Sequence, residues 1–266
     1  MYKKFSKEYI EFWENEYLKN IHNSLLLDKE RMIDGFSTKE DIREDWEEHL
    51  GKETSDFAVG SERIFYWLFN QFGQPNSSPI GSDLFFETYN AYIHIDIKTV
   101  TTDNVGDING SIFVGDNQNN YEGYIELQGK NKQPRKYKGN LPKVYTKKDG
   151  TKKMCLTYFI CILYTNNGDI QFISLLSMPN GILYDVYGNR VLKAGKNPGK
   201  IRFNFSQTPT FELLEEQPSR IKFVLVNPEM SEELKTKSKK ILEFYNNKDA
   251  IKSSCLLYTS PSPRDS

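Results

Sequence analysis

The chain has 266 residues, enough for one large domain or two small ones. Apolar residues make up 38%, charged residues 27% and aromatic residues 14%, and this composition excludes an intrinsically disordered chain. No apolar run approaches the roughly 18 residues of a membrane span, and the N-terminus becomes charged too early for a signal peptide, so an intracellular protein is expected. The formal net charge of -1 argues against indiscriminate binding to nucleic acids.

Helices are predicted at the N-terminus, over residues 5–50. "YIEFWENEYLKNIHNSLLL" repeats apolar residues at helical spacing, and Thr38 is a candidate N-cap for the helix after it. "AVGSERIFYWLFNQFG" is predicted as another helix, with Ser61 near its start and Gly73 at its end.

Strands follow the turn-rich "GQPNSSPIGS". "DLFFET" and "AYIHIDIKTV" are separated by Tyr89-Asn90, which is typical of an antiparallel hairpin. After a long polar region that reaches about residue 153, "MCLTYFICILYT" and "DIQFISLLSM" flank Asn166-Asn167-Gly168, a second hairpin turn. "KIRFNF" and "RIKFVLV" add strands, and a last helix is predicted to begin at Ser231.

This order of elements predicts one α/β domain with a mixed central sheet. The domain would span residues 1–253, with a helical N-terminal region (1–57), a core (58–226) and a C-terminal helix (227–253). The tail "CLLYTSPSPRDS", residues 255–266, looks like a translated sequencing adaptor and is expected to be foreign to the protein.

Cysteine and histidine do not predict a metal site. Cys155, Cys161 and Cys255 have neither metal-ligand spacing nor an even number for disulfides. Buried thiols are the favoured interpretation, with a reactive thiol as the alternative. The three histidines are too scattered for a zinc site.

Charge is unevenly distributed along the chain. Residues 1–60 carry 15 acidic against 9 basic residues, whereas residues 130–153 carry 10 basic residues and a single acidic one. Two interpretations of the basic segment remain open: a solvated loop, or an arm that contacts DNA phosphates. The phosphate contacts predicted by the second interpretation are Lys147, Lys148, Lys152 and Lys153.

Charged residues interrupt the apolar strand "YIHIDIKTV". Because side chains alternate between the two faces of a strand, His94, Asp96 and Lys98 are predicted to share one face, opposite the isoleucines between them. Two charges in such a strand are costly unless something compensates them. An internal ion pair between Asp96 and Lys98 is therefore one interpretation.

A metal site is the other interpretation. Asp83 begins the preceding strand, and a hairpin would bring it beside Asp96. Paired carboxylates suit Mg²⁺, and a neighbouring lysine can orient water and stabilise charge on a phosphoryl transition state. Glu62, on the helix before the hairpin, is a further candidate carboxylate, or simply a helix-start residue favoured by the helix dipole.

These residues resemble the signature of the PD-(D/E)xK nuclease superfamily, an Asp at the start of one strand and Asp/Glu-x-Lys in the next. The two halves read "PIGSD", in which Pro79 stands four residues before Asp83, and "IDIKTV". The order of "PIGSD", "IDIKTV", "DNQNN", "LPKVY" and "SMPNG" is similar to that in the BglI-type type II restriction endonucleases over about residues 58–226.

The resemblance implies a restriction-endonuclease-like sheet flanked by helices, and a Mg²⁺-dependent homodimer that cuts both strands of a DNA site. Asp83 and Asp96 with the Ile97 carbonyl, and Glu62 as a further ligand, would hold the metal, and Lys98 would position the attacking water. His94 is interpreted as a polar neighbour, with a proton carrier as the alternative. The resemblance further implies the cytoplasm of a prokaryote, no membrane contact, and a cognate DNA methyltransferase without direct contact.

Base contacts are predicted more loosely. Asp103 could accept a hydrogen bond from a cytosine amino group, Arg220 and Lys222 could point outward and donate to guanine, and Gln118 is another candidate. The alternatives are ordinary loop polarity for Asp103 and Gln118, and the solvent face of an edge strand for the two basic residues. Two other functions also stay open: a repair or recombination nuclease of the same superfamily, and a DNA-binding relative without catalysis.

Overall fold

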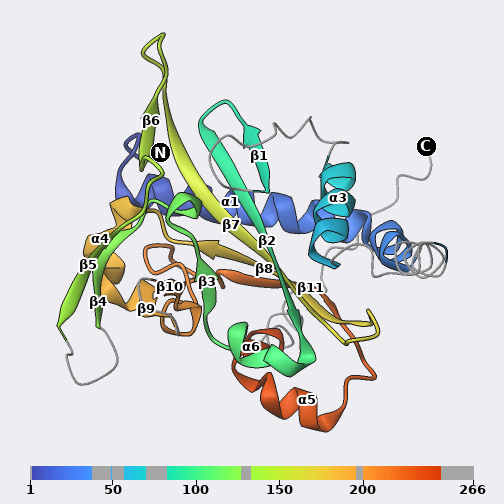
Figure 1. Cartoon of the computed structure of the whole chain (residues 1–266). Helices are drawn as coiled ribbons and strands as arrows, with labels where there is room; N and C mark the ends of the chain where they lie inside the picture. The colour runs from blue at the N-terminus through green and yellow to red at the C-terminus, as the bar shows by residue number, and fades with distance from the viewer. Residues whose placement is uncertain are drawn as a thin grey trace, which may run out of the picture.

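A six-stranded sheet forms the centre of the computed structural model, which describes residues 2–37, 49, 57–69, 83–126, 133–195 and 200–246 (Figure 1). Its strands run in the order β1-β2-β7-β8-β11, and β6 pairs with β7. Their bounds are β1 Leu84–Glu87, β2 Ala91–Thr101, β6 Val144–Thr146, β7 Lys152–Tyr164, β8 Ile170–Met178 and β11 Ile221–Val226.

Both predicted hairpins are confirmed. Strands β1 and β2 pair antiparallel with Leu84 opposite Ile95, and β7 and β8 also pair antiparallel. In the turn between β7 and β8, Gly168 has a φ of 90°, a conformation that a residue without Cβ adopts readily. Strands β2 and β7 run parallel, so the sheet is mixed, as predicted.

Helix α1 (Lys7–Leu27) covers one face of this sheet, against β7, β8 and β11 (Figure 1). The Ser6 side chain caps its first turn, and its buried apolar positions follow the helical period. Helix α3 (Phe57–Phe69) contacts β2. Ser61 lies inside α3 rather than near its start, and the predicted helix boundaries at Thr38 and Gly73 lie outside the described residues.

A small three-stranded sheet, β3-β10-β9, lies against the other face. Ring centroids of Phe203 in β10 and Phe159 in β7 are 6.4 Å apart. The segment predicted as a long polar region, which reaches about residue 153, contains strand β3, the η1 and η2 turns, the β4–β5 hairpin and strand β6. The bounds are η1 Thr102–Asp107, β3 Ile112–Val114, η2 Asp116–Gln118, β4 Glu122–Glu126, β5 Pro134–Lys138, β9 Leu192–Ala194 and β10 Ile201–Phe203.

The closing helix begins where it was predicted, because the Ser231 hydroxyl accepts a hydrogen bond from the N–H of Leu234. It is divided into α5 (Glu232–Lys237) and α6 (Lys239–Asn246). The remaining short helices are η3 Gly181–Leu183, α4 Tyr184–Tyr187, η4 Gly188–Val191 and η5 Phe205–Gln207. Within the described ranges, no helix is long and apolar enough to cross a membrane. The tail over residues 255–266 lies outside those ranges.

Candidate active site

Strand β2 carries the predicted catalytic residues at the point where it leaves the core. Its residues from Ile93 to Asp96 are buried, and those from Ile97 to Thr101 are half-buried. The parallel register with β7 sets Asp96 beside Phe159. A backbone held on both sides by neighbouring strands is rigid, so the side chains near position 96 combine a fixed origin with access to solvent.

The predicted alternation of faces is confirmed. The Nζ atom of Lys98 lies 5.5 Å from the ring centroid of Phe113 in β3 and 5.8 Å from that of Phe159, on the side of the small sheet. Ile93 and Ile95 instead line an apolar pocket on the side of α1.

Asp83 reaches β2 from the start of β1. Its Oδ2 accepts a hydrogen bond of 2.6 Å from the backbone N–H of Ile97. Burial raises the pKa of Asp83, and the Ile97 N–H and the charge of Lys98 act in the opposite direction. The hairpin therefore brings Asp83 to the centre of β2, next to Asp96, as predicted.

Asp96 is 3% exposed and forms an ion pair with Lys98. Burial raises the pKa of Asp96 to about 6; Lys98 lowers it, whereas the charges of Asp83 and Glu62 raise it further. The ion-pair interpretation is thus confirmed, but it does not satisfy the carboxylate. Asp96 Oδ2 contacts the Lys98 ammonium and has no other polar partner among the described residues, although a carboxylate oxygen can accept more than one such contact.

The chemistry of this donor set fits a divalent cation. Asp83 and Asp96 offer carboxylate oxygens beside the backbone of Ile97, and hard oxygen ligands of this kind suit Mg²⁺. Asp96 Oδ2 is the best-placed ligand atom, because Oδ1 is already bonded to the Gln118 amide and the Lys98 ammonium is the one described partner of Oδ2. Glu62 is exposed on α3, and its charge reaches Asp96. No three His, Cys, Asp or Glu side chains form a ready-made metal cluster in the described part of the chain, so Glu62 as a ligand stays a prediction.

His94 shares the face of Asp96 but is buried against aromatic residues. Its ring centroid is 5.0 Å from that of Phe85, edge to face. Burial lowers the pKa of His94 to about 4. The imidazole is therefore neutral near pH 7, which favours the polar neighbour over the proton carrier.

Both described cysteines are buried, as the favoured interpretation predicted. Burial raises the pKa of the Cys155 thiol to about 12 and that of Cys161 further, so neither forms an appreciable amount of thiolate near neutral pH. Cys255 lies outside the described residues.

Gln118, predicted as a base contact, lies inside the site. Its Nε2 donates to Asp96 Oδ1 at 2.5 Å, and its Oε1 accepts from Lys98 Nζ at 3.1 Å. The sequence motif "DNQNN" placed this residue in a polar loop and held no signal for these contacts.

The prediction that Arg220 and Lys222 point outward is wrong. Arg220 is fully buried, where it forms ion pairs with Glu11 and Glu14 of α1. Lys222 is half-buried, and burial and the charge of Lys19 in α1 lower its pKa. Both side chains therefore face α1, on the side of the sheet opposite Lys98. Arg220 and Lys222, two residues apart, do share one face, but that face is the covered one and not the outward one that was predicted.

The basic segment, residues 130–153, called the basic arm below, is partly tied to the hairpin of β1 and β2, called the catalytic hairpin below. Lys147 and Lys153 form ion pairs of 2.8 and 2.7 Å with Glu87 at the end of β1. Lys153 is buried and also donates to the Thr88 carbonyl, so the prediction that it is an exposed phosphate contact is wrong.

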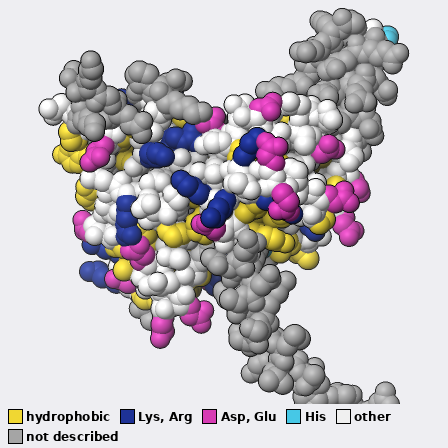
Figure 2. All heavy atoms as spheres, turned by 90° about the horizontal axis from the view of Figure 1, so that it is seen from below, with side chains coloured by type: hydrophobic (Ala, Val, Ile, Leu, Met, Phe, Trp, Pro, Cys, Tyr) yellow, Lys and Arg dark blue, Asp and Glu magenta, His cyan; other side chains and the backbone are white. Residues whose placement is uncertain are grey.

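The remaining exposed residues of the predicted DNA-contact set, two lysines of the arm and one aspartate of a loop, are accessible to DNA. Lys148 and Lys152 are both exposed. Asp103 is exposed in η1, where it accepts a hydrogen bond of 2.9 Å from the Asn166 amide. Figure 2 shows Lys and Arg side chains near the middle of the face seen from below, so the small net charge hides an uneven surface.

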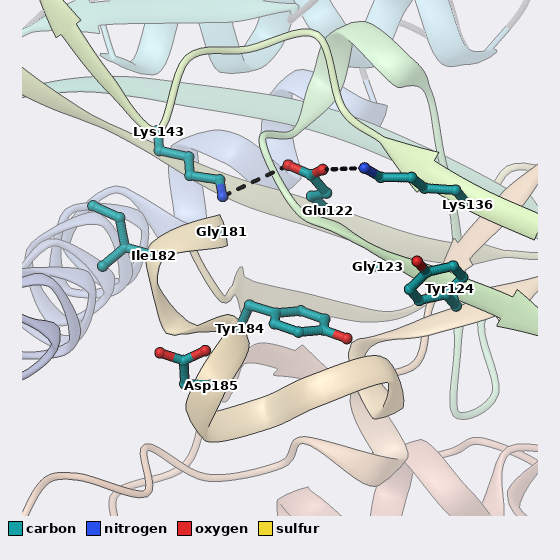
Figure 3. Close-up of a pocket in the computed structure, with 9 residues that line it drawn as sticks. All are labelled: Glu122, Gly123, Tyr124, Lys136, Lys143, Gly181, Ile182, Tyr184 and Asp185. Carbon is teal, nitrogen blue, oxygen red and sulfur yellow. Dashed lines mark ion pairs between the residues drawn. The ribbon is translucent and has the colours of Figure 1, made fainter.

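A separate pocket of about 510 Å³ lies between the β4–β5 hairpin and the α4 region (Figure 3). Glu122 lies between two lysines there, 3.1 Å from Lys136 and 3.9 Å from Lys143. The predicted catalytic residues do not line this pocket, and its central carboxylate is already neutralised. The residues around β2 therefore remain the candidate site for catalysis.

A solved structure of a restriction endonuclease supports the fold. The structure titled "Crystal structure of tetrameric restriction endonuclease SfiI bound to cognate DNA" matches with a TM-score of 0.59 and 14% identity, covering 86% of this chain and 90% of that chain. Restriction endonuclease BglI bound to its DNA recognition sequence matches with a TM-score of 0.48 and 16% identity, covering 83% and 98%. No curated protein sequence matches this chain.

Family models identify the chain. The model described as "Type II restriction enzyme MwoI, N-terminal domain" matches residues 7–168, and "Type II restriction enzyme MwoI, central domain" matches residues 170–226. Together they cover the catalytic hairpin, the central sheet and α1. The chain therefore belongs to the MwoI family of type II restriction enzymes and is a site-specific deoxyribonuclease.

Proposed function

We propose that this restriction enzyme is a Mg²⁺-dependent homodimer that cuts both strands of its DNA site by attack of water on phosphorus. One observation carries the proposal: Asp83 and Asp96 converge beside Lys98 where β2 leaves the core. A two-fold homodimer would present one such site to each strand of a duplex.

The carboxylates would hold the cation, with the Ile97 carbonyl beside them and Glu62 as a further ligand. A divalent cation bound there supplies Lewis acidity toward the phosphodiester and lowers the pKa of water. The Lys98 ammonium lies against Asp96 and is therefore within reach of a water bound to that cation. Its ammonium would hold the attacking water in line with phosphorus and stabilise the negative charge that develops.

The aromatic neighbours of Lys98 would strengthen this effect. Phe113 and Phe159 keep bulk water from one side of the ammonium, and charges interact more strongly where water is excluded. Water adds its oxygen to phosphorus and gives up one proton to solvent, the bond from phosphorus to O3′ breaks, and O3′ takes up a proton from solvent. The products are a 5′-phosphate and a 3′-hydroxyl.

DNA contacts are proposed for the exposed members of the predicted set. Asp103 would accept from a cytosine amino group, and Lys148 and Lys152 would neutralise phosphates. Their exposure supports these roles. Arg220, Lys222 and Lys153 are left out because of where their side chains lie.

Digestion of plasmid DNA tests the proposed reaction. The full chain with Mg²⁺ is expected to give discrete fragments whose sequenced ends share one motif and carry 5′-phosphates, and chelation of Mg²⁺ should stop the reaction. Cleavage restricted to branched or damaged DNA would instead identify a repair or recombination nuclease. Binding to duplex DNA without cleavage would identify an inactive relative.

The cellular setting proposed for this enzyme is the prokaryotic cytoplasm, together with a methyltransferase that modifies the same site. DNA methylated at that motif is expected to resist cleavage. The homodimer should give a mass of twice the 31.0 kDa chain in light scattering, and a monomeric mass in the presence of the cleaved site would contradict it.

A further inference from the structure

Gln118 ends the short helical turn η2, and its position there is set by its neighbours. Asn119, the next residue, is buried and donates to the Gly115 carbonyl and the Tyr137 hydroxyl, at 3.1 and 2.7 Å. The backbone of this turn is therefore fixed on the catalytic side of β2. A side chain that starts from a fixed backbone needs few bonds to hold one orientation.

The orientation of the Gln118 carboxamide follows from its donors and acceptors. Its Oε1 accepts from the backbone N–H of Gly115 at 2.7 Å, a group that can only donate, and from Lys98 Nζ, which also can only donate. The Nε2 group is thereby directed at Asp96 Oδ1. One carboxamide thus contacts both members of the Asp96–Lys98 pair.

Gly115 leaves the room that this arrangement needs. A Cβ atom built at this position would lie 3.3 Å from both Cδ and Oε1 of Gln118, tighter than ordinary van der Waals contact. The φ of Gly115 is −76°, so its backbone conformation does not itself require glycine. Glycine at position 115 is therefore explained by the space that the Gln118 carboxamide needs, and not by the backbone conformation of the turn.

We propose that Gln118 is a positioning residue that fixes one oxygen of Asp96 and tethers the Lys98 ammonium, so that Asp96 Oδ2 is left for the cation. The inference rests on the proposed Mg²⁺-dependent function. When Oδ2 binds a cation, the ammonium must leave that oxygen, and Gln118 Oε1 keeps it beside the site. Outer-sphere partners of this kind typically alter metal affinity or activity by about 10- to 100-fold.

Three variants test this role: Gln118→Ala, Gln118→Glu and, as a control in the same turn, Asn117→Ala. Alanine removes both contacts, whereas glutamate keeps the acceptor for Lys98 but replaces the donor to Asp96 with a second carboxylate oxygen. Asn117 is exposed, and its side chain accepts a hydrogen bond from Asn140, away from the site. All variants are first checked for wild-type thermal unfolding.

Both Gln118 variants are expected to lower kcat by about 10- to 100-fold, with KM for DNA and the cut sites unchanged, and Gln118→Ala is expected to raise the Mg²⁺ concentration at half-maximal rate. Titration calorimetry with Mn²⁺, without DNA, should show weaker binding to Gln118→Ala by a similar factor. Asn117→Ala should behave as wild type. Gly115→Ala, which leaves Gln118 in the chain but crowds its carboxamide, should show part of the same loss.

Two results would overturn the assignment: wild-type kcat and Mn²⁺ affinity in Gln118→Ala, or new cut sites at an unchanged rate, which would make Gln118 a base contact. Failure of the proposed function is distinguishable from these results. It would appear as wild-type enzyme that does not cut DNA with Mg²⁺, whatever the variants do.

Discussion

Two clusters of charged side chains lie on opposite faces of the same sheet, and they differ in how completely protein encloses them from solvent. On the α1 face, Arg220 forms ion pairs with Glu11 and Glu14, and none of the three is more than 1% exposed. On the other face, Asp96 forms an ion pair with Lys98, whose side chain is 17% exposed.

The closed group is surrounded by protein groups. The Arg220 guanidinium also contacts the Tyr187 hydroxyl and lies 4.1 Å from the Phe211 ring centroid. No ligand can reach these charges, so they act only within the fold. The open group borders solvent, and its charges are available to a substrate. Burial, rather than the type of charged residue, separates the structural cluster from the candidate catalytic one.

Arg220→Met is expected to give the largest effect. It leaves Glu11 and Glu14 buried without their cation, so the free energy of unfolding should fall by about 3–5 kcal/mol. Urea unfolding measures the loss. Molecules that remain folded at low temperature should cut at the wild-type rate; altered cut sites with unchanged stability would restore Arg220 as a base contact.

Lys98→Ala should show the reverse pattern. The cleavage rate is expected to fall by about 10²–10³-fold, because a charge that stabilises the transition state is lost. Stability should change far less than in Arg220→Met, since Lys98 borders solvent and Asp96 can take up a proton. Lys136→Ala, in the separate pocket, is the matched control. Undiminished cleavage by Lys98→Ala would remove Lys98 from the mechanism.

A smaller effect is expected from Glu14→Gln, and it depends on pH. Burial raises the pKa of Glu14 from 4.5 to about 7 in the folded protein, although Arg220 acts against this. Between these values the folded chain holds a proton that the unfolded chain has released, so this stabilisation is present at low pH and lost as pH rises through about 7.

The Glu14→Gln variant carries no such proton but retains an acceptor for the Asn180 N–H. Its free energy of unfolding, relative to wild type, should therefore improve between about pH 4.5 and about pH 8. Chemical unfolding at a series of pH values provides the comparison. A difference that is constant with pH would mean that Glu14 does not titrate in this range.

The smallest effect concerns the basic arm. Replacing Lys148 and Lys152 with alanine should reduce the salt dependence of DNA affinity by about 0.9 per lost phosphate contact. Replacing Lys147 and Lys153 should change the slope less, because Glu87 already neutralises them. Affinities measured over a range of salt concentrations test this difference, and equal slopes would favour the solvated loop.

Local pattern was enough to predict the hairpin and the shared face of Asp96 and Lys98, because strand alternation relates neighbours in sequence. The position of Asp83 followed from the same hairpin. These features depend on a few adjacent residues, so the sequence contains them directly.

Distant packing was not predictable in this way. Arg220 looked like an exposed strand residue because its partners Glu11 and Glu14 lie some two hundred positions earlier in the chain. Gln118 was predicted as a base contact, with loop polarity as the alternative, because its contacts in the site depend on how β3 and η2 lie over β2. Of the three-residue strands of the small sheet, β10 was predicted within "KIRFNF", whereas β3 and β9 are too short for a periodic signal.

The parallel pairing of β2 with β7 also sets when the enzyme can become active. Asp83, Asp96 and Lys98 leave the ribosome well before β7, whose Phe159 pairs with position 96 and flanks the Lys98 ammonium. Parallel pairing between distant segments forms late in folding. We expect a nascent chain that ends before β7 to hold every predicted catalytic residue without an aligned site, so that the capacity to damage DNA is acquired only after β7 has been made. A fragment ending before residue 152 should therefore not cut.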